Sequence, residues 1–303
     1  MNAQPILSVR GLTLHFERYT AQLRRGRLEV LSGINLQLQA GEILAVAGAS
    51  GSGKSLLAHA ILGILPPGAV LGGEIDYMGA PLSEQRLQGL RGKEIALVPQ
   101  SGLYLDPLMR VGAQVGRDKA AVQSVFERYK LGASVAEMYP FQLSGGMMRR
   151  VLCATAVVGD AKLIIADEPT PGMSRELATR AMKHFRDLAS AGAAVMLITH
   201  DIELGVDYAD RVAVLYAGRT LETARASDFE REELLRHPYT KALWRALPRG
   251  GFSPTPGSQP NPGEITQGCP FAPRCDLGDK TCLQGVIEPR TVREGEVCCR
   301  HAT

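Results

Sequence analysis

Apolar and polar residues alternate along the first part of the chain, up to about residue 42. The segments 7–10 (LSVR) and 34–38 (INLQL) each place every second side chain on one face of an extended backbone. A period of two is typical of strands with one buried and one solvated face, as in antiparallel sheets. The pattern therefore predicts edge strands of an antiparallel sheet over residues 1 to about 42.

Continuous apolar runs then predict strands that are buried on both faces. Such runs occupy residues 43–47, 162–166 and 195–199, and residues 94–99 predict one further strand. Central strands of parallel sheets show this pattern because helices cover both of their faces. Helical periodicity over residues 175–190 connects the runs that begin at 162 and 195, which predicts a right-handed βαβ unit.

Three segments differ from this alternation of strands and helices. Helical periodicity over about 112–142 predicts an inserted helical subdomain at about residues 101–155. Residues 249–263 consist mainly of Gly, Pro, Ser and Gln, a composition that cannot bury enough apolar surface to become ordered on its own. We therefore divide the chain into an α/β domain at residues 1–248, a linker at 249–263 and a cysteine-rich tail at 264–303.

Charge and hydropathy limit where such a chain can act. Its 303 residues contain 34 Lys+Arg against 31 Asp+Glu, and a formal charge of +3 gives no support for a nucleic-acid partner. The N-terminus lacks a basic region followed by an apolar core, and the most apolar stretch, residues 60–65, is far shorter than the roughly 20 residues that span a bilayer. We therefore expect a cytosolic chain that reaches a membrane only through partner proteins.

One octapeptide predicts the class of ligand. Residues 48–55 match the phosphate-loop pattern G-x-x-x-x-G-K-[ST], between the strand at 43–47 and an apolar helix at 56–65. Glycines let the backbone N–H groups converge at the positive end of that helix, which favours a polyanion. Lys54 is expected to reach the β- and γ-phosphates, and the Ser55 hydroxyl to ligate Mg²⁺. The residues expected to hold the nucleotide are Gly48, Ser50, Gly51, Ser52, Gly53, Lys54 and Ser55.

Further motifs follow the loop in a fixed order. Residues 143–146 read LSGG, residues 163–168 form an apolar strand that ends in two acidic residues, and residues 198–201 read ITHD. Taken singly, they could be a helix-start turn, a solvated strand end and a core histidine. Together, behind a phosphate loop, they resemble the ATPase of an ABC transporter. The resemblance implies a P-loop NTPase fold of the α/β class, with a mixed sheet and an inserted helical subdomain, and ATP and Mg²⁺ as cofactors.

The resemblance also implies a role for each motif. Asp167 corresponds to the Walker B ligand of magnesium, and Glu168 to the catalytic residue that orients or deprotonates the attacking water. His200 corresponds to the switch histidine that contacts the γ-phosphate. Gln100 corresponds to the Q-loop glutamine, which touches both the metal and the water and couples nucleotide state to the helical subdomain.

The signature at residues 143–146 implies a second ATPase subunit. In the family, Ser144 and the backbone of Gly146 bind the γ-phosphate of an ATP that the opposite subunit holds, so one chain supplies half of each site. An aromatic residue upstream of the phosphate loop normally stacks on the adenine. Phe16 is the first candidate and Tyr19 the second, with ordinary strand packing as the alternative for either residue.

Other segments narrow the resemblance to one subfamily. Residues 139–147 and 237–243, and residues 268–275 after a Pro-rich link, are similar to the ATPases of dipeptide, oligopeptide and nickel importers. That subfamily implies a peripheral protein at the cytoplasmic face of the plasma (inner) membrane, in a heterodimer with a second ATPase subunit. Two transmembrane permease subunits and an extracytoplasmic substrate-binding protein complete the assembly. The cargo stays open among peptides, nickel and metal chelates, because the ATPase contacts membrane subunits rather than cargo.

Two other classes of protein fit the sequence less well. Soluble ABC ATPases of translation or DNA repair typically carry two nucleotide domains in tandem or a long coiled coil, whereas this chain has one set of motifs and no heptad run. A P-loop kinase or GTPase would give no reason for residues 143–146 or for His200.

The last 35 positions contain five of the six cysteines. Four of them match a pattern that binds a [4Fe–4S] cluster in some members of the subfamily: Cys269, Cys275, Cys282 and Cys299. Zinc would accept the same four ligands, and unligated buried thiols are the third alternative. Cys298 could replace Cys299 as a ligand, whereas Cys153 is expected to serve only in packing.

Two positions depart from the family pattern. Met147 stands where the signature usually has glutamine, and we expect this change to be harmless. Ser174 stands where the family usually has an aspartate that crosses the dimer interface. We hypothesise that Ser174 weakens the coupling of the two sites or makes their turnover unequal, with a neutral loop variation as the alternative. Because Glu168 is intact, hydrolysis is still expected at this site.

Overall fold

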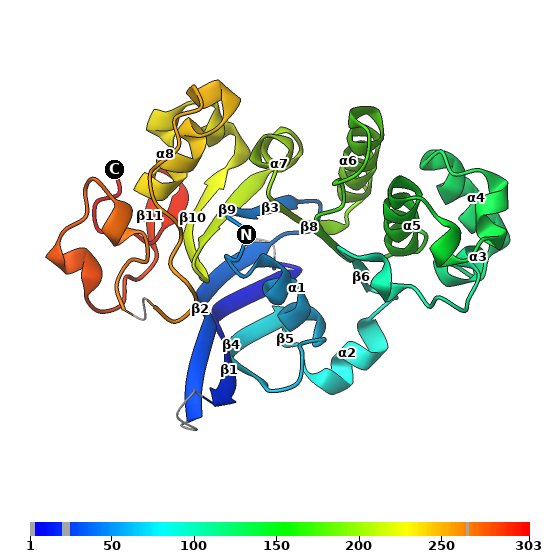
Figure 1. Cartoon of the computed structure of the whole chain (residues 1–303), viewed down its shortest axis with the longest axis horizontal. Helices are drawn as coiled ribbons and strands as arrows, with labels where there is room; N and C mark the ends of the chain where they lie inside the picture. The colour runs from blue at the N-terminus through cyan, green and yellow to red at the C-terminus, as the bar shows by residue number, and fades with distance from the viewer. Residues whose placement is uncertain (1–3, 20–24, 265–266) are drawn as a thin grey trace. The chain divides into compact units, whose positions relative to one another are not determined.

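The computed structural model (Figure 1) describes residues 4–19, 25–264 and 267–303. The chain divides into two compact units. The first unit comprises Met1–Leu38, Leu44–Leu82 and Thr199–Thr303. The second comprises Gln39–Ile43 and Ser83–Ile198. Each unit is described on its own below.

An antiparallel sheet of four strands forms the N-terminal part of the first unit, in the order β2-β1-β4-β5. Its strands are β1 (Leu7–Tyr19), β2 (Arg25–Leu38), β4 (Ala69–Tyr77) and β5 (Ala80–Pro81). The predicted alternation is confirmed, because Leu7, Val9, Leu36 and Leu38 are all buried. The prediction of edge strands is wrong for β1, which pairs with β2 on one side and with β4 on the other. Each isolated strand would expose its apolar face, so pairing and packing on the core supply the stability of this sheet.

The phosphate-loop strand lies in a second set of strands within the same unit. Their order is β11-β12-β10-β9-β3, and β3 (Ile43–Gly48) is parallel to β9 (Arg211–Tyr216). The next pairs are antiparallel: β10 (Arg219–Arg225) on β9, β12 (Gly295–Val297) on β10, and β11 (Arg290–Val292) on β12. The cysteine-rich tail therefore contributes two strands to the layer that contains the phosphate-loop strand.

One hydrophobic cluster holds these strands and the tail together. It includes Ala47 of β3, Val214 of β9, Tyr239 of α8 (Pro238–Arg245) and Phe271 of the tail. Burying one such aromatic side chain stabilises the fold by about 1.5–3 kcal/mol. The unit also contains the helices α1 (Lys54–Leu62) and α7 (Ile202–Tyr208).

The second unit contains three parallel strands in the order β8-β7-β6. They are β6 (Ile95–Val98), β7 (Leu163–Asp167) and β8 (Ala194–Thr199), and every residue of β7 and β8 is buried. The predicted crossover helix between β7 and β8 is confirmed as α6 (Arg175–Ser190). The apolar runs predicted these strands correctly because both of their faces are covered.

Short helices occupy the segment in which a helical subdomain was expected. These are α3 (Val111–Val115), α4 (Lys119–Arg128) and α5 (Gly145–Val157), preceded in this unit by α2 (Glu84–Leu90). The long stretch of helical periodicity does not form one helix, because α3 ends at its C-cap Gly116 and a separate 3₁₀ helix begins at Pro140. Among the described residues, none of the helices combines the length and the hydropathy that crossing a bilayer requires.

Candidate functional site

The phosphate loop connects β3 to α1 in the first unit, and two of its glycines fit where no other residue could. A Cβ at Gly48 would overlap the Leu215 carbonyl oxygen and lie 2.9 Å from Ser52 Oγ. Gly53 has φ +96° and a Cβ there would overlap the Leu31 side chain. Both positions therefore require glycine, and they keep the backbone in the tight turn that a phosphate cradle needs.

The Lys54 side chain is held by backbone carbonyl groups of the same loop. Lys54 is only 6 % exposed, and its Nζ donates to the carbonyl oxygens of Gly48 and Ala49 at 2.9 and 3.0 Å. Ser52 is fully buried, and its Oγ has no hydrogen-bond partner among the described residues. A buried hydroxyl without a partner is costly, so it marks a place where a polar ligand would be stabilising.

A tyrosine that the sequence analysis did not single out packs in the core of the same unit. Tyr239, from α8, packs in one hydrophobic cluster with Ala47, which directly precedes the loop, and burial raises the Tyr239 pKa to about 12. The hydroxyl therefore stays protonated at neutral pH. The only sequence signal was that residues 237–243 resemble one subfamily, and that signal gave no reason to connect this helix with the phosphate loop.

The remaining candidates of the first unit are His200 and Phe16. His200 is exposed between Thr199, whose Oγ1 accepts from the Asp201 N–H at 3.0 Å, and Asp201, which caps α7. Phe16 is half-buried in β1, opposite Leu28 of β2. The side chain of Tyr19 lies outside the described residues.

The second unit holds the acidic pair and the glutamine. Asp167 is buried at the carboxyl end of β7, whereas Gln100 is exposed just after β6. Glu168 adopts φ +48°, and its N–H donates to the Ile198 carbonyl oxygen at 2.9 Å. A non-glycine residue in this region of φ costs about 1–2 kcal/mol, and such strain is often found at functional positions.

The signature serine starts α5 in the same unit. Ser144 Oγ accepts from the Met147 N–H at 3.3 Å, which is the usual arrangement of a helix N-cap. Ser144 and Gly145 are exposed, and a Cβ at Gly145 would meet nothing within 4 Å. The N-terminus of this 13-residue helix is therefore accessible from solvent. Ser174 similarly caps α6, through its Oγ and the Leu177 N–H at 3.4 Å.

The tail brings together the four cysteines that the sequence grouped. They line one small cavity of about 10 Å³ with His237 and His301. These four cysteines are Cys269, Cys275, Cys282 and Cys299. Burial, with smaller contributions from the neighbouring Cys299 and Cys275, raises the Cys269 pKa to about 11. As in the rest of the described chain, these cysteines form no disulfide.

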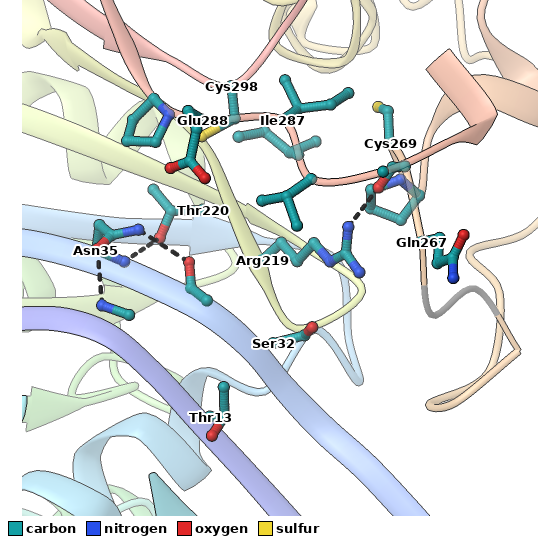
Figure 2. Close-up of a pocket in the computed structure, with 18 residues that line it drawn as sticks. Thr13, Ser32, Asn35, Arg219, Thr220, Gln267, Cys269, Ile287, Glu288 and Cys298 are labelled. Atoms are coloured by element: carbon teal, nitrogen blue, oxygen red, sulfur yellow. Dashed lines mark hydrogen bonds between the residues drawn. The ribbon is translucent and has the colours of Figure 1, made fainter. Parts of the chain in front are cut away.

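Cys298 and Cys153 lie elsewhere. Cys298 lines a larger pocket of about 540 Å³, and Figure 2 shows it beside Glu288 and away from Cys269. Cys153 is fully buried in α5, as expected for a packing residue, and burial raises its pKa to about 12.

His237 faces the cysteine cavity with one ring nitrogen and caps α8 with the other. Its Nδ1 accepts from the Tyr239 N–H at 2.9 Å, and its Nε2 lies 3.8 Å from Cys269 Sγ. Burial lowers the His237 pKa to about 3, so the ring is neutral at pH 7. Because Nδ1 is an acceptor, the single ring proton belongs on Nε2, from which it can point at the sulfur.

No three of the four thiols that line the cavity have their sulfurs all within 4.8 Å of one another. Among the described residues, the only trio of metal-binding side chains with ligand atoms within 4.8 Å of one another is Asp279, Cys282 and His301. The four sulfurs of a zinc site would lie about 3.8 Å apart. The four thiols therefore line one cavity, but in any three of them at least one sulfur–sulfur distance is longer than in a zinc site.

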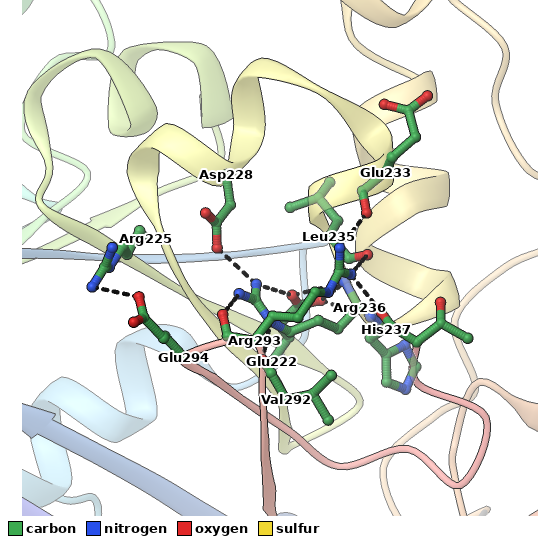
Figure 3. Close-up of polar contacts among 11 residues, drawn as sticks. Glu222, Arg225, Asp228, Glu233, Leu235, Arg236, His237, Val292, Arg293 and Glu294 are labelled. Atoms are coloured by element: carbon green, nitrogen blue, oxygen red, sulfur yellow. Dashed lines mark hydrogen bonds and ion pairs between the residues drawn. The ribbon is translucent and has the colours of Figure 1, made fainter.

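A buried ionic network fixes the tail strands to the segment before α8 (Figure 3). Arg236 pairs with Glu222 at 3.3 Å and with Asp228 at 2.7 Å, and both Arg236 and Glu222 are almost fully buried. Arg236 also donates to the Val292 carbonyl oxygen at 2.6 Å and to the Arg293 carbonyl oxygen at 2.5 Å. The network therefore connects β10 and the segment before α8 with the end of β11 and the turn that follows it.

Comparison with known proteins gives two family matches along this chain. Residues 31–171 match a family described as ABC transporter. Residues 221–282 match a family described as the oligopeptide/dipeptide transporter C-terminal region.

Curated relatives are similar along nearly the whole length. The dipeptide transport ATP-binding protein DppD of Bacillus subtilis is 32 % identical over 298 residues, which cover 90 % of this chain and 87 % of DppD. The oligopeptide transport ATP-binding protein OppD of Salmonella typhimurium is 34 % identical over 289 residues, which cover 88 % of this chain and 86 % of OppD.

Solved structures share the fold. A dimeric ATP-binding cassette in a post-hydrolysis state with ADP and Pi superposes with a TM-score of 0.65 at 24 % identity, over 73 % of this chain and 98 % of that one. At this identity the similarity supports the predicted α/β cassette fold and nothing further.

Proposed function

This chain belongs to the ABC transporter family of ATP-binding subunits, and we propose that it hydrolyses ATP to drive the import of dipeptides or oligopeptides. The observation that carries the peptide assignment is the match of residues 221–282 to the C-terminal region of oligopeptide/dipeptide transporters. The relatives cited above are named for peptide transport. Neither is named for nickel or metal chelates, or for a role outside transport.

The geometry of the phosphate loop supports nucleotide binding. Gly48 and Gly53 permit the tight turn of the loop, because a Cβ at either position would overlap neighbouring protein atoms, and the buried Ser52 hydroxyl has no hydrogen-bond partner among the described residues. Lys54 holds its ammonium against the loop carbonyls, from which it would turn toward the β- and γ-phosphates. These groups fit the triphosphate of ATP because each supplies a donor or a positive charge to a polyanion.

Hydrolysis requires metal ligands and groups that act on the attacking water. Ser55 and Asp167 carry the hard oxygen ligands that suit Mg²⁺. Bound Mg²⁺ would neutralise charge that develops on the phosphates during transfer. We assign to Glu168 the orientation and deprotonation of the attacking water, to Gln100 a contact to that water, and to His200 a hydrogen bond to the γ-phosphate.

A second ATPase subunit would complete the site. The exposed N-terminus of α5, with Ser144 and Gly146, is suited to bind the γ-phosphate of an ATP held by another chain. The solved cassette cited above is itself a dimer. We propose a heterodimer with a different ATPase subunit, in which the adenine stacks on Phe16.

Membrane association would come through permease subunits. Leu103, Leu108 and Phe141 in the second unit are 92 %, 87 % and 74 % exposed. Large apolar side chains at such exposure are typical of surfaces that partners cover. We place two permease subunits against this region, at the cytoplasmic face of the inner membrane, with an extracytoplasmic binding protein that delivers the peptide.

The cysteine cavity of the tail is the candidate site of a [4Fe–4S] cluster. Cys269, Cys275, Cys282 and Cys299 would hold it as thiolates, which is the ligand set such clusters use. Bound, the cluster would cross-link four points of a tail that has little regular structure. The residues themselves exclude water from the sulfurs, because Cys269, Cys282 and Cys299 are all buried.

Anaerobic purification tests the cluster. The protein is expected to be brown and to contain iron and sulfide, and Cys299→Ser is expected to lose both. Cys298→Ser is the matched control, since Cys298 lies outside the four-cysteine cavity. Colourless protein without iron or sulfide, made with ample iron, would refute the assignment, and zinc in its place would favour the mixed site at Asp279, Cys282 and His301.

The transport function is tested in vesicles that contain the whole assembly. ATP-dependent uptake of a labelled dipeptide is expected, and Glu168→Gln is expected to reduce hydrolysis by about 100-fold or more while ATP binding is kept. Glu176→Gln, an exposed carboxylate on α6, is the control and should leave hydrolysis unchanged. Normal hydrolysis by Glu168→Gln would refute its role, and uptake of nickel without peptide uptake would refute the peptide assignment.

A further inference from the structure

Three side chains of different chemistry converge in the tail, and two of them also line the cysteine cavity. One ligand atom from each of Asp279, Cys282 and His301 lies within 4.8 Å of the other two. Cys282 and His301 line the cavity, whereas Asp279 does not. Asp279 caps the 3₁₀ helix Lys280–Leu283, which contains Cys282, and His301 belongs to the segment after β12. The group therefore joins two separate segments of the tail.

The Asp279 carboxylate uses one oxygen for the backbone and turns the other toward His301. Its Oδ1 accepts from the N–H groups of Thr281 and Cys282, at 2.8 and 3.1 Å, and so caps the 3₁₀ helix. These bonds fix the carboxylate on the same turn as the Cys282 thiol. Its Oδ2 lies 3.0 Å from His301 Nε2. Oδ2 is therefore held in place without taking part in the cap.

His301 brings a buried ring nitrogen to this carboxylate without forming a hydrogen bond to it. Nε2 is buried and has no hydrogen-bond partner among the described residues, although Oδ2 is only 3.0 Å away. The ring nitrogen therefore does not point at Oδ2. Two ligands of one tetrahedral zinc ion show this arrangement, because each points at the ion and bonds of about 2.0–2.1 Å place them about 3.3 Å apart. A buried nitrogen without a partner is costly, so an ion beside it would be stabilising.

The donor set of the group selects the kind of ion. Zinc accepts a thiolate sulfur, an imidazole nitrogen and a carboxylate oxygen, whereas Mg²⁺ and Ca²⁺ take oxygen ligands. The side chains of His301 and Asp279 are 36 % and 46 % exposed, so water can reach a fourth position. Three protein ligands and one water complete the four-coordinate geometry that zinc prefers.

We infer that Asp279, Cys282 and His301 form a zinc site of their own, and that zinc and the proposed cluster exclude each other because both need the Cys282 thiolate. The zinc site stands on the geometry above, whereas the exclusion rests on the proposed cluster. Bound zinc would join the turn at residues 279–282 to the segment after β12, and so hold the tail together when it carries no cluster. The Cys282 thiol releases its proton to solvent on binding, and no oxidant or reductant takes part.

Zinc binding to the full-length chain, reduced and freed of metal by a chelator, is the first test. We expect one zinc ion per chain, and binding weakened at least about 10-fold in His301→Gln and in Asp279→Asn. Asparagine also caps helices, so Asp279→Asn removes the charged ligand and keeps the turn. Asp276→Asn changes an exposed carboxylate outside the group and is the matched control. Unchanged zinc affinity in both His301→Gln and Asp279→Asn would overturn the site.

Cys269→Ser separates this site from one built on the four thiols. Cys269 lines the cysteine cavity but is not in the group. Its substitution should abolish the cluster and leave the zinc affinity unchanged, whereas Cys282→Ser should abolish both. Loss of zinc binding in Cys269→Ser would assign zinc to the four thiols and overturn the inference.

Cobalt reads the ligands in the wild-type chain, so this test does not depend on the folding of a variant. Co²⁺ in place of zinc gives a thiolate-to-metal absorption whose intensity reports the number of thiolates bound. We expect the intensity of a single thiolate, and the intensity of four would overturn the inference.

Competition tests the exclusion. The wild-type chain loaded with iron and sulfide should take up zinc only as iron is released, and zinc binding at full affinity beside an intact cluster would overturn the exclusion. If no chain takes up iron and sulfide, the proposed cluster fails and the exclusion fails with it. His301→Gln and the cobalt spectrum still decide the zinc site in that case.

Discussion

At the scale of single residues, the side chains at the site have structural duties as well as the chemical roles that we propose. Lys54 stabilises the loop before any phosphate arrives, through two backbone carbonyls. Ser144 and Ser174 each begin a helix as an N-cap. Glu168 carries backbone strain at φ +48°. A substitution at such positions can therefore act through the fold as well as through chemistry, and controls must separate the two effects.

Ser174→Asp tests the departure from the family pattern without disturbing the helix. Aspartate caps helices as well as serine does, so the free energy of unfolding should change by less than about 0.5 kcal/mol. In the heterodimer we expect greater cooperativity of ATP hydrolysis if Ser174 weakens the coupling of the two sites. Unchanged cooperativity would instead support a neutral variation. Ser174→Ala, which loses the cap, is the control and should cost about 1 kcal/mol in stability.

His184 predicts a dependence of stability on pH. Its Nδ1 lies 3.1 Å from the Tyr129 hydroxyl, and burial lowers the His184 pKa from 6.5 to about 4. The unfolded chain therefore binds the proton first as the pH falls. The stabilisation is fully present above pH 6.5 and is lost progressively between pH 6.5 and 4.

Urea unfolding checks this prediction. Between pH 7.5 and 4.5, His184 should remove roughly 2–3 kcal/mol from the free energy of unfolding, because the unfolded chain takes up the proton at higher pH than the folded chain does. His184→Gln keeps a partner for Tyr129 and should show a smaller loss over the same range. An equal loss in both proteins would contradict the assignment to His184.

At the scale of elements, the tail is part of the ATPase core. Its strands β11 and β12 extend the layer of β10, and Phe271 lies in one hydrophobic cluster with residues of β3. Composition indicated a separate appendage, because residues 249–263 have few apolar side chains with which to pack. The segment nevertheless offers backbone carbonyls, and Arg274 donates to those of Thr255 and Pro256.

Arg236→Met tests how the tail is attached. It leaves Glu222 buried without its ionic partner and removes the donors to Val292 and Arg293. Losing one partner of a buried ion pair typically costs about 3–5 kcal/mol. Urea unfolding should show that loss, and limited proteolysis should cleave the tail faster. Arg225→Met is the control, because the Arg225 pair with Glu294 in the same region is exposed and should contribute at most about 1 kcal/mol.

At the scale of the whole molecule, the proposed function depends on surfaces that this chain offers to others. The N-terminus of α5 is exposed, and large apolar side chains are exposed on the second unit. Neither the exposed helix N-terminus nor the exposed apolar side chains stabilise an isolated monomer. Both are explained if the chain works as one of two ATPase subunits beneath a pair of permeases.

Leu103→Ser with Leu108→Ser tests the permease surface. Since both side chains are almost fully exposed, the double variant should keep its stability and its ATP affinity. Copurification with the permease subunits should weaken by about 10-fold or more, as for the loss of two central contact residues. Val286→Ser, an exposed apolar residue of the tail, is the control. Unchanged copurification of the double variant would exclude this region as the contact.

The sequence by itself determined the elements and the chemistry of the loop. Periods of two, continuous apolar runs and helical spacing are local consequences of burial, so they predicted the antiparallel strands, the parallel strands and α6. The phosphate-loop pattern is also local, because its glycines and lysine act within eight consecutive residues. Helix ends were predicted less well, since capping by residues such as Gly63 competes with periodicity there.

Only the tertiary structure decided which distant segments meet. Ala47, just before the phosphate loop, and Tyr239 of α8 lie far apart in the chain, and they pack in one hydrophobic cluster only because the fold brings them together. The distinction between Cys298 and Cys299 has the same origin. Neighbours in an extended segment point to opposite faces, so one thiol reaches the four-cysteine cavity and the other lines a different pocket. No local pattern encodes which face that will be.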